Sequence, residues 1–128
     1  MDRPNTRSPL ARAAGLGSSR TGAADWWGQR VSALALIPLT LWFGASIIAH
    51  THSDYAAFTN WLSAPVPTIL MILLLIALFH HTALGLQVVI EDYSHSGAKF
   101  AILAIMRLSC LLLAVAGIVA TLRIALSG

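Results

Sequence analysis

Five ionisable side chains lie within, and at the end of, one long apolar stretch of the sequence. His80 and His81 are adjacent in the segment FHHTALGLQVVIEDY, and Glu91, Asp92 and Tyr93 close it. The stretch is apolar enough to cross a lipid bilayer. An ionisable side chain inside a bilayer costs free energy, so its presence there indicates a functional site by default. These residues are therefore the candidate site of the chain.

A histidine at mid-membrane depth has three possible roles: proton relay, hydrogen bond to a neighbouring helix, or axial ligand to haem. Residues four apart share one face of a helix, so His81 is flanked by Ala77 and Gly85. Such small residues leave room either for a flat macrocycle or for close helix packing. His80 points roughly 100° away and cannot bind the same iron. We take His81 as the ligand candidate and predict that His80 contacts another helix.

A second axial histidine is not available at the depth of His81. His50 ends the first apolar run at the predicted outer surface, and His81 lies about 20 Å below that surface. His50 and His52 are therefore predicted to be interfacial residues. The chain is expected to carry half of a site, which another chain completes.

The acidic end of the same stretch suits a lipid-soluble quinone. Asp92 follows His81 by eleven residues, which puts both on one helical stripe, about 16 Å apart. Reducing a quinone takes two electrons and two protons, so a hydroxyl donor and a titratable group are needed. Tyr93 and Asp92 are the candidates for these two roles. The alternative is a helix end that dips into lipid headgroups.

Two arginines and a serine lie near these residues along the predicted helices. Arg30, at the inner end of the first span, is expected at the depth of Asp92, where it could pair with Asp92, a haem propionate or a lipid phosphate. Snorkelling to headgroups is the alternative. Arg107, inside the third span, either snorkels or faces a polar interior. Ser32 is a candidate pocket wall.

Composition indicates an all-α integral membrane protein. Hydrophobic residues make up 57% of the 128 residues and charged residues 10%. A bilayer core needs roughly 20 apolar residues of helix. Three stretches qualify, at about 31–49, 67–90 and 100–126. We predict an N-terminal arm, 1–29, and a three-helix membrane anchor, 30–128, that is half of a heteromeric helix bundle.

The distribution of basic residues predicts the orientation. Most of them precede the first span: Arg3, Arg7, Arg12, Arg20 and Arg30. The loop after that span has no lysine or arginine, so the N-terminal arm and the 92–99 connection are predicted to be cytoplasmic. A basic arm beside a span indicates contact with lipid, not nucleic acid. Its short length favours a bacterial inner membrane, and its Arg, Ser and Ala content leaves a mitochondrial inner membrane as the alternative.

The same sequence argues against several other classes of protein. Cys110 is the only cysteine, which excludes an intrachain disulfide and a thiolate metal site. No internal repeat of the kind found in secondary transporters is evident. Two rival interpretations remain: a small proton-relay transporter subunit that uses His81 and Asp92, and a structural anchor or assembly protein without haem.

The pattern H-x(3)-G-x(6)-D-Y, formed by His81, Gly85, Asp92 and Tyr93, resembles the small hydrophobic membrane anchor of succinate dehydrogenase (complex II), the D-subunit family. Residues 15–33, GLGSSRTGAADWWGQRVSA, are similar to that family's entry into its first span. The family has three spans with the N-terminus inside, so the resemblance covers nearly the whole chain.

The resemblance implies a role for each matching residue. His81 would be one axial ligand of haem b, a cytochrome b subunit would supply the other, and Arg30 would lie near the haem propionates. Tyr93 would hydrogen-bond ubiquinone, and Asp92 would support proton delivery. Some relatives carry a histidine where this chain has Ala24, so any propionate contact from that position is absent.

The function implied by the resemblance is to anchor the flavoprotein and iron–sulfur subunits to the membrane. The chain would also form part of the site where electrons from succinate reach ubiquinone, in electron transport and the tricarboxylic acid cycle. The sequence holds neither a flavin motif nor a cysteine cluster. We therefore expect a subunit of an enzyme that is not catalytic alone.

Overall fold

Four helices make up the part of the chain that the structure, a computed structural model, describes. They are α1 (Ser8–Ala49), α2 (Tyr55–Leu62), α3 (Pro65–Tyr93) and α4 (Ala98–Ser127). The structure describes residues 8–93 and 97–127, with side chains from residue 23 onward, so residues 1–7 of the predicted arm and 94–96 of the predicted cytoplasmic connection lie outside it.

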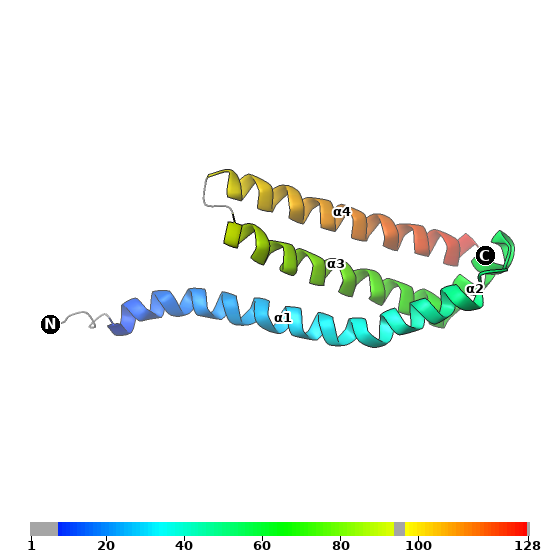
Figure 1. The fold of residues 1–128 in the computed structure, drawn as a ribbon, viewed down its shortest axis with the longest axis horizontal. Coiled ribbons are helices and arrows are strands. Elements are labelled where there is room, and N and C mark those ends of the chain that lie inside the picture. The colour runs from blue at the N-terminus through cyan, green and yellow to red at the C-terminus, as the bar shows by residue number, and fades with distance from the viewer. Residues whose placement is uncertain (1–7, 94–96, 128) are drawn as a thin grey trace.

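The three long helices form a single antiparallel layer with α3 in the middle (Figure 1). Each is long and apolar enough to cross a membrane, over Ala23–Ala49, Pro65–Tyr93 and Ala98–Ser127. The three predicted spans are therefore confirmed, and each helix extends beyond its predicted limits. The N-terminal part of α1, the end of α3 and the start of α4 lie at one end of the layer, as the predicted orientation requires (Figure 1).

The first helix differs most from the prediction, because α1 begins at Ser8 and not near residue 31. The predicted arm is rich in Ala and Arg, which are among the best helix formers. Pro9 stands in the first turn, where a missing N–H costs little. Pro38 lies inside α1, and the helix continues through it. Residues 23–30 thus continue the helix of residues 31–49, and by length and composition Ala23–Ala49 could cross a membrane as one span.

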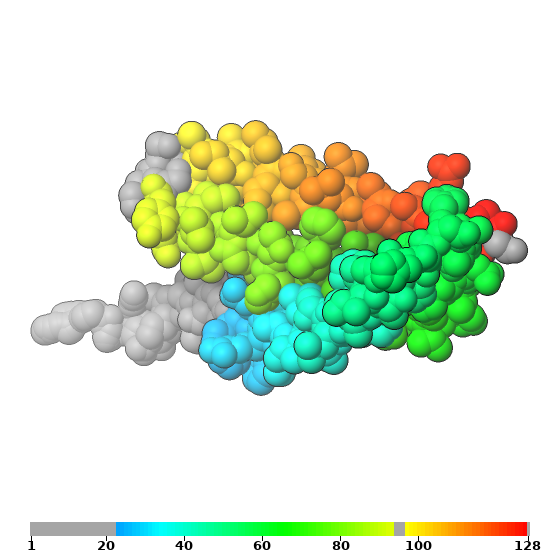
Figure 2. Space-filling model, turned by 45° about the vertical axis from the view of Figure 1, so that its right-hand side comes forward, coloured from blue at the N-terminus to red at the C-terminus, as the bar shows by residue number. Residues whose placement is uncertain are grey.

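A short helix that the sequence analysis did not predict, α2, caps the opposite end of the layer (Figure 2). The Asp54 side chain accepts a hydrogen bond of 2.8 Å from the Ala57 N–H and caps its N-terminus. The ring of His50 lies 4.4 Å from that of Trp61, between centroids, and 5.9 Å from that of Phe58. His50 therefore belongs to an aromatic cluster at the predicted outer surface, far from His81.

The buried core is small and lies between α1 and α3. Its buried members are Leu39, Leu74 and Ala77. Many large apolar side chains are exposed instead, among them Leu112 of α4, with 68% of its surface exposed. Patches of this extent mark surfaces that meet lipid or other proteins. The single chain is thus suited to a membrane and to partners, not to water.

Candidate functional site

His81 lies at the interface between α1 and α3, half-buried. Its Nδ1 atom is 3.1 Å from Oγ of Ser32, which α1 presents to α3 and of which only 5% is exposed. The Ser32 hydroxyl also donates to the carbonyl oxygen of Gln29, at 3.0 Å. Two residues that are far apart in the sequence therefore meet inside the predicted membrane region.

A cavity of about 360 Å³ adjoins His81. We call it the imidazole cavity; its lining residues are Trp26, Gln29, Arg30, Ala33 and His81. The guanidinium of Arg30 lies 5.0 Å from the centroid of the Trp26 ring, in the range of a cation–π contact. The cavity thus combines one imidazole with one cation that is held by an aromatic ring.

The position of Arg30 corrects the depth that we assigned to it from the sequence. Arg30 lines the same cavity as His81, and Ser32 contacts His81 directly. Asp92 lies about 16 Å further along α3. The expectation that Arg30 shares the depth of Asp92 is therefore wrong. It rested on a first span that starts at residue 31, whereas α1 continues as a helix well before Arg30.

Small residues lie one turn to either side of His81. Ala77 is buried in the core between α1 and α3 and so packs against α1. A Cβ atom built on Gly85 would lie 3.9 Å from Nε2 of Gln29, which is ordinary van der Waals contact. The backbone of α1 therefore does not press on Gly85, and space remains beside this residue.

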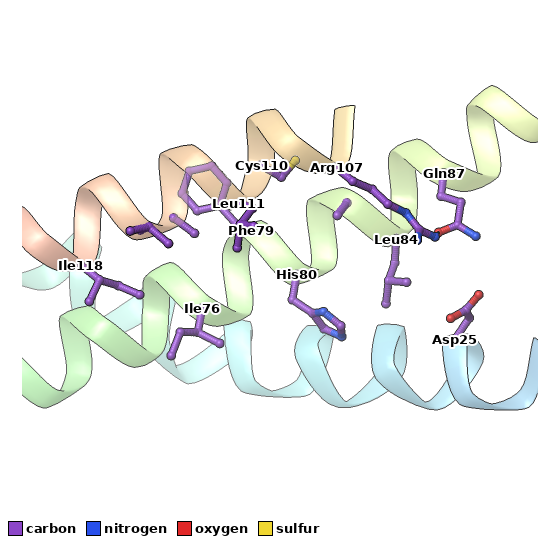
Figure 3. A pocket seen from close by; sticks show the side chains of 13 residues that line it. Asp25, Ile76, Phe79, His80, Leu84, Gln87, Arg107, Cys110, Leu111 and Ile118 are labelled. Carbon is purple, nitrogen blue, oxygen red and sulfur yellow. The ribbon is translucent and has the colours of Figure 1, made fainter. Parts of the chain in front are cut away.

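His80 faces a different space from His81. A Cβ atom on Gly28 of α1 would lie only 3.1 Å from Nε2 of His80, so the ring touches that helix, as predicted. Figure 3 shows the His80 ring pointing from α3 toward α1, at the edge of a groove of about 510 Å³ along α3 and α4. We call this the α3–α4 groove.

Polar side chains gather at one end of the α3–α4 groove. Arg107 of α4 donates a hydrogen bond to Oε1 of Gln87 on α3, and Asp25 of α1 lies close by (Figure 3). Gln87 in turn donates to a carboxylate oxygen of Glu91 at 3.4 Å. Arg107 thus has a polar partner on another helix. The sequence analysis missed Gln87, although its spacing of seven from His80 puts both on one stripe.

Asp92 and Tyr93 are the last residues of α3. Both side chains are exposed, and 84% of the Tyr93 surface is open. The structure therefore leaves the two predicted quinone-site residues free for a ligand or partner at the end of the layer. They are not in contact with the imidazole cavity, because eleven residues of helix separate Asp92 from His81.

The imidazole cavity is lined by one imidazole, that of His81, and one guanidinium, that of Arg30. Among the residues that the structure describes, no group of three or more His, Cys, Asp or Glu side chains could hold a metal ion. His50 lies about 27 Å along α1 from Ser32, which contacts His81. An imidazole and a guanidinium could hold the iron and a carboxylate of a haem from one face, and a second ligand to that iron would have to come from another protein.

Comparison with known proteins gives the family. The sequence profile of the succinate dehydrogenase/fumarate reductase transmembrane subunit matches residues 4–121. The chain belongs to this family. Its relatives include hydrophobic membrane anchor subunits of succinate dehydrogenase. The one from Rickettsia bellii is 33% identical over 87 residues, covering 68% of this chain and 70% of that protein.

Two further anchor subunits are similar over most of their length. The one from Rickettsia conorii is 27% identical over 116 residues, covering 89% of this chain and 92% of the relative. The one from Paracoccus denitrificans is 28% identical over 92 residues, covering 72% and 71%. No solved structure gives a significant match.

The family membership fixes the coarse function of the chain. It is a multi-pass membrane anchor subunit of succinate dehydrogenase, which implies assembly with the other subunits of that complex in an inner membrane. The resemblance inferred from the His81-to-Tyr93 pattern is confirmed, as is the all-α fold with three spans.

Proposed function

We propose that the anchor subunit binds one face of a haem b through His81 and forms part of a ubiquinone-reduction site through Asp92 and Tyr93. One observation carries the haem assignment: His81 and Arg30 line the same cavity at the α1–α3 interface. Imidazole is a common axial ligand of haem iron. A guanidinium binds carboxylates in bidentate fashion and so suits a haem propionate.

The other axial ligand is assigned to a cytochrome b subunit. Within the described part of this chain, His80 faces the α3–α4 groove and His50 belongs to the cluster around α2. Neither shares the imidazole cavity with His81. The many exposed apolar side chains of the layer offer a surface on which such a subunit can pack.

The quinone assignment rests on the chemistry and exposure of the last turn of α3. The Tyr93 hydroxyl can donate a hydrogen bond to a quinone carbonyl oxygen, and the Asp92 carboxylate can pass protons from water toward it. Both side chains are exposed at the predicted cytoplasmic end of the layer. Electrons from succinate would arrive there through the flavoprotein and the iron–sulfur subunits.

The α3 histidine pair supplies a matched test of haem binding. We expect the assembled complex with His81→Ala to lose the b-type band from its reduced-minus-oxidised absorption spectrum. The complex with His80→Ala should keep that band, because His80 lies beside Gly28 and away from the cavity. A band that persists in His81→Ala at normal haem content would overturn the haem assignment. It would leave the structural anchor or the proton relay as the function of His81.

A further inference from the structure

Ser32 is a buried hydroxyl within the first membrane span, and its contacts account for its polar atoms. Its Oγ atom donates to the carbonyl oxygen of Gln29 at 3.0 Å, a bond within α1. The same atom lies 3.1 Å from Nδ1 of His81 on α3. A serine that bonds backward to its own helix is common. One that also meets a candidate metal ligand on another helix calls for a functional account.

Counting protons at this contact assigns a direction to the second hydrogen bond. A hydroxyl has one proton to donate and lone pairs with which to accept. With the Ser32 proton donated to the Gln29 carbonyl, which the 3.0 Å contact permits, the bond with His81 takes its proton from the imidazole. In this arrangement Nδ1 of His81 is the protonated ring nitrogen, and Nε2 keeps its lone pair. Only a nitrogen with a free lone pair can bind a metal.

We propose that Ser32 is the positioning residue that holds His81 in the tautomer and ring orientation needed for axial ligation of haem iron through Nε2. The inference rests on the proposed haem ligation by His81. Metal-binding histidines generally donate their other ring N–H to an acceptor, and loss of that acceptor costs roughly 10- to 100-fold in metal affinity or activity. In this subunit the acceptor is the Ser32 hydroxyl of the neighbouring helix.

The proposal predicts an electronic effect as well as a mechanical one. A hydrogen bond donated from Nδ1–H increases the electron density of the imidazole and makes it a stronger donor to iron. A stronger donor favours the ferric over the ferrous state. Loss of the Ser32 hydroxyl should therefore raise the reduction potential of the haem and change the ligand field of the ferric iron.

The test uses four substitutions in the complete complex. Ser32→Ala removes the hydroxyl. Ser32→Thr and Ser32→Val have nearly the same shape and differ in whether a hydroxyl or a methyl group is present. Ser46→Ala is the matched control, because Ser46 lies on the same helix and its hydroxyl donates only to the Trp42 carbonyl, at 2.8 Å.

Three measurements are made on each purified complex: the ratio of haem to flavin, the electron paramagnetic resonance spectrum of the ferric haem, and the haem reduction potential. For Ser32→Thr and Ser46→Ala we expect wild-type values. For Ser32→Ala and Ser32→Val we expect an altered ferric spectrum and a raised potential, with haem affinity lower by roughly 10-fold. Complete loss of haem from the Ala and Val variants, with retention in the Thr variant, would also support the proposal.

Two outcomes would overturn the proposal. Wild-type spectra and potentials in both Ser32→Ala and Ser32→Val would show that the hydroxyl does not act on the haem. Equal changes in Ser32→Thr and Ser32→Val would show that shape matters and the hydrogen bond does not. Failure of the haem assignment itself is recognised separately, because His81→Ala would then retain its haem.

Discussion

Gly28 of α1 lies directly against the imidazole of His80 on α3. A Cβ atom at position 28 would come within 3.1 Å of His80 Nε2 and 3.3 Å of a methyl carbon of Leu84. Ser32 stands one turn further along α1 on the same face and contacts His81. The close approach at Gly28 thus sets the helix separation at which Ser32 can reach His81.

Larger side chains at Gly28 should therefore disturb both packing and the site. We expect Gly28→Ala to have a small effect, because the contacting atoms are ends of side chains that can shift by a few tenths of an ångström. Gly28→Leu should destabilise the complex by about 1–3 kcal/mol through overpacking and lower its haem content. The measurement is thermal unfolding in detergent, together with the haem-to-flavin ratio.

Gly44 provides the control for this series, because a Cβ atom there meets nothing within 4 Å in this chain. Gly44→Leu should leave the haem ratio unchanged. Equal haem loss from both leucine variants would contradict the idea that the Gly28 contact sets the α1–α3 separation.

Arg107 of α4 and Gln87 of α3 are joined by a hydrogen bond, and removing one partner should change the free energy of unfolding more than removing the other. Gln87→Leu leaves a guanidinium without its partner on α3, whereas Arg107→Leu leaves only an amide. We expect Gln87→Leu to lower the free energy of unfolding more than Arg107→Leu does. The coupling energy between the two positions, from a double-mutant cycle in detergent, should be about 0.6–1.7 kcal/mol. A coupling energy near zero would mean that the two side chains act independently.

The Tyr93 hydroxyl should matter for quinone and not for succinate. A hydrogen bond worth about 1.4 kcal/mol in the transition state corresponds to a tenfold change in rate. We therefore expect Tyr93→Phe to slow ubiquinone reduction by roughly tenfold, with succinate oxidation by an artificial dye largely kept. Tyr55→Phe, at the start of α2, is the control and should affect neither activity. Equal loss of both activities in Tyr93→Phe would indicate failed assembly instead.

Removing the charge of Arg30 should change the haem through electrostatics. A positive charge near the propionates disfavours the ferric state, so Arg30→Gln should lower the reduction potential of the haem. Arg30→Lys keeps the charge but loses the bidentate geometry, and an intermediate value is expected. Arg123→Gln, near the C-terminal end of α4, is the control. Redox titration of the three purified variant complexes measures their haem reduction potentials. A potential that is unchanged in Arg30→Gln would show that Arg30 does not lie at the haem site.

The direction of the Arg30 effect is opposite to that expected for Ser32→Ala. The two residues lie within one turn of α1; Arg30 lines the imidazole cavity with His81, and Ser32 contacts His81. A general disturbance of α1 would shift the haem reduction potential in the same direction in Arg30→Gln and in Ser32→Ala. Shifts in opposite directions would show that the charge of Arg30 and the hydrogen bond of Ser32 act on the haem independently.

The sequence by itself determined the three membrane-spanning helices and the family. Three apolar stretches of spanning length can satisfy their backbone hydrogen bonds in a bilayer only as helices. Helix geometry alone predicted that the side chains of His80 and His81 point in different directions. It also predicted that His50 and His81 lie at different depths in the membrane. The His81-to-Tyr93 pattern was enough to recognise the succinate dehydrogenase anchor family, which the family profile confirms.

The tertiary structure decided the register between helices. The periodicity of one helix carries no information about how far its neighbour slides along it. The depth of Arg30 was therefore predicted wrongly, and the bond of Arg107 to Gln87 was not foreseen. The helix α2 was missed because its eight residues are too short for a clear pattern. Only the packing of α1 on α3, close at Gly28, brought the Ser32 hydroxyl to the His81 imidazole.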